Sequence, residues 1–142
     1  MSQATQLCTF YVEGLLLGVE VEKVQEVIRY QEMTPVPLAT PVIGGLINLR
    51  GQIVTAVDLR RRLGLSARAE GRMPMNVVIR TDDGAMSLLV DEIGDVVEIE
   101  EASFEAAPDT LAEDARELIR GVYKVKHQLL LLLDTDKSVS SA

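Results

Sequence analysis

Two blocks of similar sequence stand in the same order in the two halves of this 142-residue chain. The block GLINLRGQIVTAVD at 45–58 is echoed by GVYKVKHQLLLLLD at 121–134, with glycine, glutamine and aspartate at matching places. A shorter pair precedes them, VEKVQEVI at 21–28 and VDEIGDVV at 90–97. Because a repeated order of blocks indicates one supersecondary unit built twice, the sequence predicts two small subdomains of similar structure.

Short apolar stretches separated by turn residues run through both halves. Such stretches are typical of β-strands, and their repetition favours an all-β barrel or sandwich over alternating strands and helices. We place the halves at 7–64 and 76–134, joined by a connection at 65–75. The segment 21–28 is left ambiguous, since its apolar residues have helical spacing but are β-branched. The predicted strands are 7–12, 15–19, 44–49, 52–57, 76–81, 85–90, 93–99, 118–125 and 128–133.

Turn and cap residues define the remaining elements. Glycine at the Arg50-Gly51 turn suits a tight hairpin. Asp58 is a good N-cap for a short helix at 59–63. The stretch 100–117 is predicted as a long acidic connection. The strand residues that we expect to be mostly buried include Ile53, Val57, Leu89, Val90, Leu130 and Leu132.

The charge of the chain limits its partners. The net charge is −8 and the pI is about 4.6, which argues against nucleic-acid binding. Eleven acids and one base lie between 91 and 117, whereas six arginines lie between 50 and 72. Two interpretations are open: an ordinary solvated acidic face with a basic helix, or a dipolar surface that orients partners during encounter.

No constellation of residues that performs chemistry is present in the sequence. The single cysteine, Cys8, cannot form an internal disulfide and is expected to act as a small buried apolar residue. The single histidine, His127, is interpreted as a turn residue. One cysteine and one histidine cannot make a structural zinc site, and phosphate-binding loops and nucleophile elbows are absent. The sequence therefore predicts no catalytic, metal or cofactor site, and no enzyme.

Targeting features are also absent from the sequence. The stretch MSQATQ at the N-terminus lacks the regions of a signal peptide. The longest apolar run, 129–133, is far shorter than the roughly 20 residues that span a bilayer. We therefore expect a soluble, cytoplasmic protein that does not insert into a membrane.

Two charged residues lie in apolar surroundings. Glu26 lies inside VQEVI, and Arg50 lies at the tip of the INLRG hairpin. Arginine is suited to bidentate pairing with a carboxylate, within a chain or across an interface. They are either two unrelated surface charges or a pair that shapes a binding groove.

Taken together, these segments resemble the chemotaxis coupling protein (CheW) family. The stretch VPLATPVIGGLINLRGQIVTAVDLRRRLG carries the signature G-x-I-N-L-R-G-x-I at 45–53, and TFYVEG, VEKVQEVI, SLLVDEIGDVVEI and LIRGVYKVKHQLLLLLD follow the family's order. The resemblance covers nearly the whole chain. It implies two intertwined five-stranded SH3-like β-barrels with one or two short helices.

The resemblance also implies a non-enzymatic signalling adaptor at the receptor array, on the inner face of the membrane. Such an adaptor couples the cytoplasmic tip of a chemoreceptor to the regulatory domain of the histidine kinase CheA. The receptor- or kinase-binding surface implied for this chain comprises Glu26, Arg50, Asn48, Val24, Val27 and Val36. An alternative is a CheW-like scaffold of a non-flagellar pathway with pilus motility or second-messenger output. A regulatory module with one partner outside chemotaxis is a further possibility, and a small hydrolase lacks an evident nucleophile and base.

Overall fold

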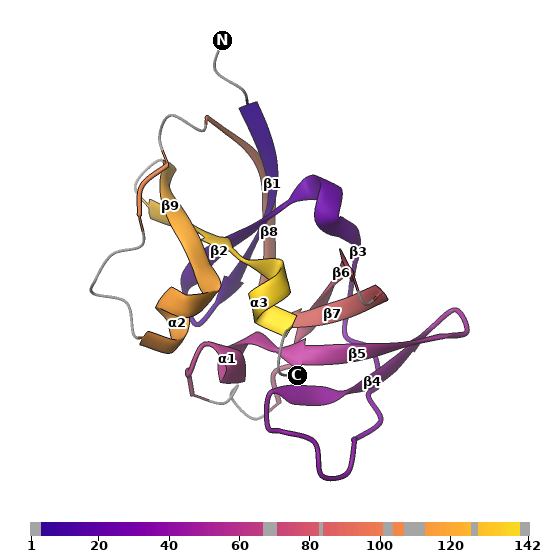
Figure 1. Ribbon diagram of the computed structural model, residues 1–142. Coiled ribbons are helices and arrows are strands. Elements are labelled where there is room, and N and C mark those ends of the chain that lie inside the picture. Colours follow the sequence, from indigo (N-terminus) through magenta and orange to yellow (C-terminus); the bar gives the residue numbers. More distant parts are fainter. Residues whose placement is uncertain are drawn as a thin grey trace.

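The structure is a computed structural model that describes residues 4–66, 71–82, 84–100, 104–106, 113–125 and 128–139. The turn predicted at Lys126-His127 lies outside the described residues. Figure 1 shows that the described chain is built mainly of strands, with a few short helices. The fold class predicted from the sequence, all-β with few helices, is confirmed.

The strands form two five-stranded sheets. Sheet A has the strand order β8-β1-β2-β10-β9 and sheet B has the order β3-β6-β7-β5-β4. Sheet A occupies the upper part of Figure 1 and sheet B the lower right. In sheet A the bounds are β1 Ala4–Val12, β2 Leu15–Glu20, β8 Glu92–Glu100, β9 Ile119–Val125 and β10 Gln128–Leu133. In sheet B they are β3 Val24–Ile28, β4 Ile43–Leu49, β5 Gln52–Asp58, β6 Met75–Thr81 and β7 Gly84–Val90.

The two halves of the sequence exchange strands between the sheets. The hairpin β1–β2 from the first half pairs with β8 and, in parallel, with β10 from the second half. Conversely, the hairpin β6–β7 pairs with β3 and, in parallel, with β5. Shifting every strand number by five converts one sheet order into the other. The duplication is therefore visible in the topology, although each sheet draws on both halves.

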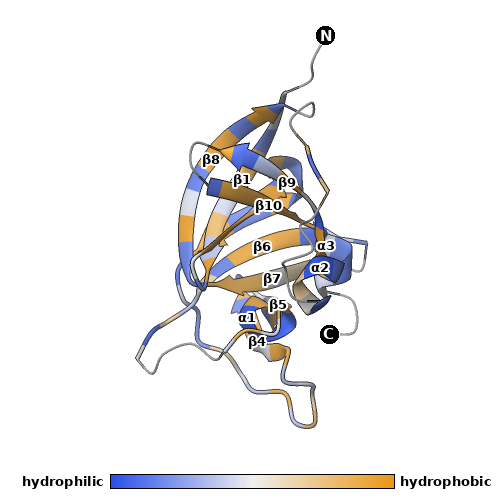
Figure 2. Ribbon diagram, turned by 90° about the vertical axis from the view of Figure 1, so that its left-hand side faces the viewer, coloured by the Kyte–Doolittle hydropathy of each residue, from blue (hydrophilic) through white to orange (hydrophobic). Residues whose placement is uncertain are grey.

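The main core is shared by the two sheets. It contains Phe10 and Leu17 from sheet A together with Val57, Ile79 and Leu88 from sheet B, all fully buried. Figure 2 shows apolar residues along the inner strands β6 and β10, and an alternation of polar and apolar residues along β8. Burial of one apolar side chain stabilises a fold by about 1.5–3 kcal/mol, so this common core holds the two sheets together.

Five of the six strand residues expected to be buried are at most 5% exposed, namely Val57, Leu89, Val90, Leu130 and Leu132. The expectation for Ile53 was wrong, because its exposed fraction is 61%. Both faces of β5 carry apolar residues, so alternation alone does not decide which face is inside. Val54 and Ala56 take buried positions on the opposite face. On the face of Ile53, Val57 reaches the shared core, whereas Ile53, next to the hairpin turn, lies beyond it.

Gly45 on β4 and Gly121 on β9 occupy matching positions in the two halves. At each glycine an earlier segment of the chain passes close over the strand. A Cβ on Gly45 would lie 2.9 Å from both the Cβ of Met33 and the carbonyl oxygen of Thr34. A Cβ on Gly121 would collide with the ring of Phe104. Beside each glycine an isolated bridge fixes the crossing, Thr34 to Leu46 in one half and Glu105 to Val122 in the other.

The helices are short. Helix η1, a 3-10 turn at Val21–Lys23, precedes β3 and resolves the ambiguous segment into a turn followed by a strand. Helix α1 covers Leu59–Arg62, and the side chain of Asp58 caps it by accepting a hydrogen bond from the Arg60 amide at 3.1 Å, as predicted.

Two further helices were not predicted. Helix α2, Glu113–Leu118, lies in the stretch predicted as an acidic connection, and α3 covers Thr135–Val139. Helix α2 contacts β9 and α3 contacts β6, and the two helices contact each other, so they connect the sheets at one side. Among the described residues, no helix is long and apolar enough to cross a membrane.

Candidate functional site

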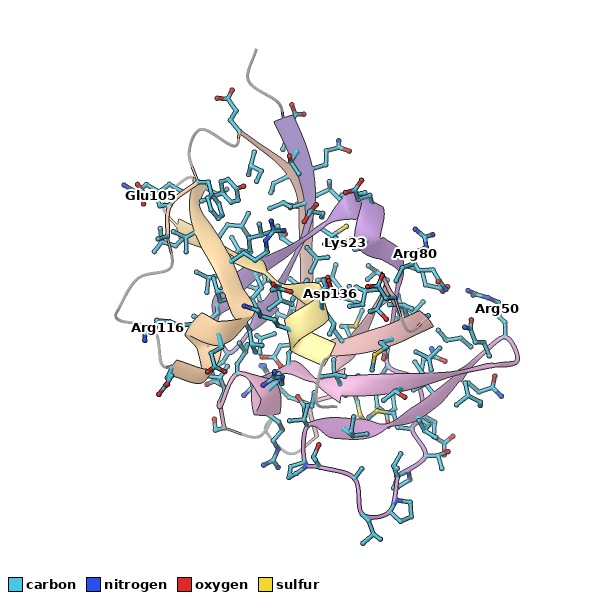
Figure 3. The ribbon with its side chains drawn as sticks, in the orientation of Figure 1. Lys23, Arg50, Arg80, Glu105, Arg116 and Asp136 are labelled. Atoms are coloured by element: carbon cyan, nitrogen blue, oxygen red, sulfur yellow. The ribbon has the colours of Figure 1, made fainter. Side chains whose placement is uncertain are left out.

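The hairpin between β4 and β5 has a two-residue turn with an unusual backbone. Arg50 has φ 51° and Gly51 has φ 91°, both in the left-handed region. A two-residue loop with positive φ at both positions is the pattern of a type I′ turn, whose twist matches that of the flanking strands. Glycine adopts this conformation freely, whereas arginine does so at a cost. Figure 3 shows Arg50 at the far tip of the hairpin.

Arg50 and Glu26 form an ion pair. The Arg50 Nη2 donates a hydrogen bond to the Oε2 of Glu26 on β3. The side chain of Arg50 is 73% exposed, whereas that of Glu26 is only 20% exposed. The hydrogen bond from Arg50 lowers the pKa of the Glu26 carboxyl below its ordinary value. Since β3 and β4 are the two edge strands of sheet B, the pair links the edges and helps to close the sheet into a barrel.

Asn48 contacts the same turn. Its Oδ1 accepts a hydrogen bond from the Gly51 amide at 2.9 Å, while the residue itself is exposed. Three of the residues in the predicted binding set, Glu26, Asn48 and Arg50, are thus gathered by direct contacts around one hairpin tip.

The three valines of the predicted set are not gathered in the same way. Val24 is half-buried and packs against the shared core. Val27, next to Glu26 on β3, is 39% exposed. Val36 lies in the loop after β3 and lines a groove of about 410 Å³ together with Leu46 and other uncharged residues. Val24 therefore supports the strand from inside, and Val27 and Val36 remain available at the surface.

Ile53 belongs to this surface, although the sequence interpretation placed it in the core. It lies directly opposite Asn48 in the β4–β5 register, so the two side chains share the outer face. With Met33, Leu46 and neighbouring residues it lines a second groove, of about 560 Å³. Pairing Asn48 with Ile53 across the predicted hairpin would have found it, because an exposed polar residue places its cross-strand neighbour outside as well.

The described residues offer little for catalysis or metal binding. Among them, no group of three or more His, Cys, Asp or Glu side chains could hold a metal ion. Cys8 is half-buried, and this burial raises the pKa of its thiol, which disfavours the reactive thiolate. His127 lies outside the described residues. The described surface presents an ion pair and, on the strands that carry it, exposed apolar side chains, a combination suited to binding another protein.

Comparisons with known proteins agree with this architecture. The family model for the CheW-like domain matches residues 6–142. The chain is 30% identical to the chemotaxis protein CheW of Bacillus subtilis, over 92% of this chain and 84% of that protein. It is also 30% identical to the chemotaxis protein CheW of Thermotoga maritima, over 94% of this chain and 87% of that protein.

A solved structure shares the fold. The scaffolding protein TtCheW from Thermoanaerobacter tengcongensis superimposes with a TM-score of 0.83 at 24% sequence identity, covering 93% of this chain and 90% of that one. The two-barrel fold implied by the sequence resemblance is consistent with this match. On the strength of the family match and the curated relatives, the chain belongs to the CheW-like family of chemotaxis scaffold adaptors, which are not enzymes.

Proposed function

We propose that the chain couples the cytoplasmic tip of a chemoreceptor to the regulatory domain of the histidine kinase CheA. It would do so in the cytoplasm, at the receptor array on the inner face of the membrane. The observation that carries the proposal is the Glu26–Arg50 pair at an exposed hairpin tip. The strands that carry the pair also hold exposed apolar side chains, Val27 on β3 and Ile53 on β5. Membership of the CheW-like family supports the same role.

The chemistry of this surface suits a helical receptor tip. The side chains of Ile53 and Val27 are 61% and 39% exposed, and they would lose their contact with water on docking, which favours association. Arg50 keeps most of its guanidinium open to solvent while Glu26 holds one nitrogen, so further donors remain for a partner's carboxylate or carbonyl. Apolar contact would then supply affinity, and the oriented charge would supply register and specificity.

A second partner requires a second surface, and the fold contains a second sheet outside the hairpin tip. Each of the two sheets has its own small cluster of core residues besides the shared core. We assign the hairpin tip of sheet B to the receptor. The kinase regulatory domain would then bind elsewhere, so that both partners can be held at once.

Titration of each partner against variants of the chain tests the proposal. Arg50→Ala should weaken binding of a receptor tip by about 2–5 kcal/mol, or roughly 30-fold to several thousand-fold, if Arg50 is a desolvated interfacial contact. Glu26→Arg should weaken the same contact by reversing the charge. Arg61→Ala, which removes an exposed arginine on α1, is the matched control and should leave affinity unchanged.

The kinase domain serves as an internal control in the same experiment. Its affinity for Arg50→Ala and Glu26→Arg should stay near that of the wild type, and a mixture of all three proteins should elute as one ternary complex. Unchanged receptor affinity for both folded variants would remove this surface from the receptor site. Failure of the wild type to bind either partner would contradict the adaptor role itself.

A further inference from the structure

We infer that Asn48 is a positioning residue for Arg50: its side chain holds the turn that presents the guanidinium, and it does not itself contact the partner. The inference rests on the proposed function, since it concerns the same receptor-binding surface. It changes the role of Asn48 from a contact residue, which the family resemblance implies, to a support for its neighbour.

The first step is the strain in the turn. Arg50, with φ 51°, is a non-glycine residue in the left-handed region. This conformation brings the Cβ of an L-residue close to the following carbonyl oxygen, so it is strained for residues other than glycine. A residue in such a conformation persists only when surrounding contacts fix it. Without such contacts, the Arg50-Gly51 turn would relax toward other turn geometries, and Arg50 would point in other directions.

The second step is the contact that fixes the turn. The side-chain oxygen of Asn48 accepts the Gly51 amide at 2.9 Å. In a two-residue hairpin loop the flanking pair, here Leu49 and Gln52, closes the ladder, and the amide of the second loop residue has no place in it. The Asn48 side chain, on β4, accepts the hydrogen bond from this amide. The bond therefore links the residues on either side of Arg50. Asparagine side chains commonly stabilise turns by this kind of bond to a nearby backbone amide.

The third step is the dependence of the ion pair on the turn. Glu26 is fixed in the middle of β3, with a side chain that is 20% exposed. The Arg50 guanidinium can meet this carboxylate only if the backbone at the hairpin tip directs it there. By holding the turn, Asn48 therefore also holds the Glu26–Arg50 pair in the geometry that a receptor tip would meet.

A double-mutant cycle tests the inference with a receptor tip as the titrant. Asn48→Ala should weaken binding by about twofold to tenfold, the range expected for loss of one net hydrogen bond. In the Arg50→Ala background the same change should have no further effect, because nothing remains to be positioned. Asn48→Asp keeps the acceptor oxygen and removes the amide donors, so it should bind within a factor of about two of the wild type.

Two controls separate positioning from general damage. Gln52→Ala removes an exposed amide side chain from the other side of the turn and should not change affinity. Affinity for the kinase regulatory domain should stay constant throughout, because a merely structural defect would lower both affinities. Exchange of the Gly51 amide hydrogen should be faster in Asn48→Ala than in the wild type or in Asn48→Asp.

Each contrary outcome identifies what fails. An equal loss from Asn48→Ala in both backgrounds, or a large loss in Asn48→Asp, would make Asn48 a direct contact and overturn the inference. If Asn48→Ala binds the receptor tip as tightly as the wild type while Arg50→Ala binds it more weakly, the inference is wrong but the proposed receptor site stands. Wild-type affinity for Arg50→Ala would overturn both.

Discussion

Arg60 and Asp91 form a two-point contact that ties the two sheets together. The Nε of Arg60 donates to one carboxylate oxygen of Asp91 at 2.9 Å, and its Nη2 donates to the other at 2.7 Å. The two side chains are only 9% and 10% exposed. Arg60 follows β5 of sheet B, and Asp91 lies between β7 and β8, where the chain passes from sheet B to sheet A.

Other groups complete this cluster. The Nη1 of Arg60 donates to the carboxylate of Glu13, in the β1–β2 turn, and to the carbonyl of Ser66 at 3.1 Å. The Glu13 amide donates to Asp91 at 2.7 Å. The hydrogen bonds from Asp91, with the nearby acidic charges, raise the pKa of the Arg60 guanidinium, so it stays charged. A charge this well buried stabilises the fold only while its partners are present.

Removal of this arginine should destabilise the fold strongly. Arg60→Ala leaves the Asp91 carboxylate buried without its cation, which typically costs about 3–5 kcal/mol. Urea denaturation measures the change as a lower midpoint. Arg61→Ala, on the exposed neighbour, is the control and should stay within about 0.5 kcal/mol of the wild type. Equal midpoints for the two variants would show that the cluster contributes little.

The crossing of Phe104 over Gly121 gives a second stability prediction. Gly121→Ala places a methyl group into the ring of Phe104 and within 2.6 Å of the Glu105 carbonyl oxygen. Overpacking of this kind costs about 1–3 kcal/mol. The double variant with Phe104→Ala removes the ring but not the carbonyl, so it should recover part of the loss attributed to Gly121→Ala. A thermal midpoint for Gly121→Ala equal to that of the wild type would contradict the crossing.

Leu38 should be replaceable with a gain in stability. It has φ 65° and is fully exposed, in a turn closed by the hydrogen bond from the Ala39 amide to the Val36 carbonyl. A left-handed leucine is strained by roughly 1–2 kcal/mol, and the extra unfolded-state freedom of glycine offsets about 0.5–1 kcal/mol of that. Leu38→Gly should therefore raise the free energy of unfolding by about 0.5–1 kcal/mol. Destabilisation in urea would mean that Leu38 has packing contacts.

The sequence pattern was sufficient for the elements whose causes are local. Alternation and turn residues predicted strands that lie within or close to those observed. Asp58 was correctly predicted to be the N-cap of the short helix that follows it. The repeated blocks predicted two similar units. These features depend on neighbours within a few residues, which is the range over which a sequence pattern carries information.

Features set by long-range contacts were missed. The acidic stretch at 113–118 forms a helix because Ala115 and Leu118 are buried against the core, which outweighs the polar composition of the segment. Three successive arginines look alike in sequence, yet Arg60 binds the buried carboxylate of Asp91, which lies 31 residues away in the chain. Ile53 and Val57 lie on the same face of β5, and only Val57, at the end of the strand away from the hairpin turn, meets the shared core.

The acid dependence of stability should reveal the Glu26–Arg50 pair. Arg50 lowers the pKa of Glu26 in the folded state below its ordinary value of 4.5. A depressed carboxyl pKa contributes stability that is present above the unfolded pKa and is lost as pH falls through the folded pKa. Glu26→Gln should therefore be less stable than the wild type near neutral pH. The difference should shrink as the pH falls below 4.5 and vanish once the pH lies below the folded-state pKa. A difference that is constant with pH would exclude a titrating pair.

Ile53 offers the sharpest separation of binding from folding. Its side chain is 61% exposed on the outer face opposite Asn48, so Ile53→Ser removes little buried contact and should change stability by no more than about 0.5 kcal/mol. If the receptor tip covers this position, full burial of the isoleucine contributes about 1.5–3 kcal/mol, so the variant should bind roughly tenfold to a hundredfold more weakly.

Val96→Ser is the matched control for this experiment. Val96 is an aliphatic residue of similar exposure, 59%, on β8 of sheet A. Calorimetric titration of one receptor tip into both variants compares the two surfaces directly. A loss confined to Ile53→Ser locates the receptor on the hairpin of sheet B, where Arg50 and Glu26 lie. A loss confined to Val96→Ser would move the receptor to sheet A and contradict the assignment of Ile53 to the binding surface.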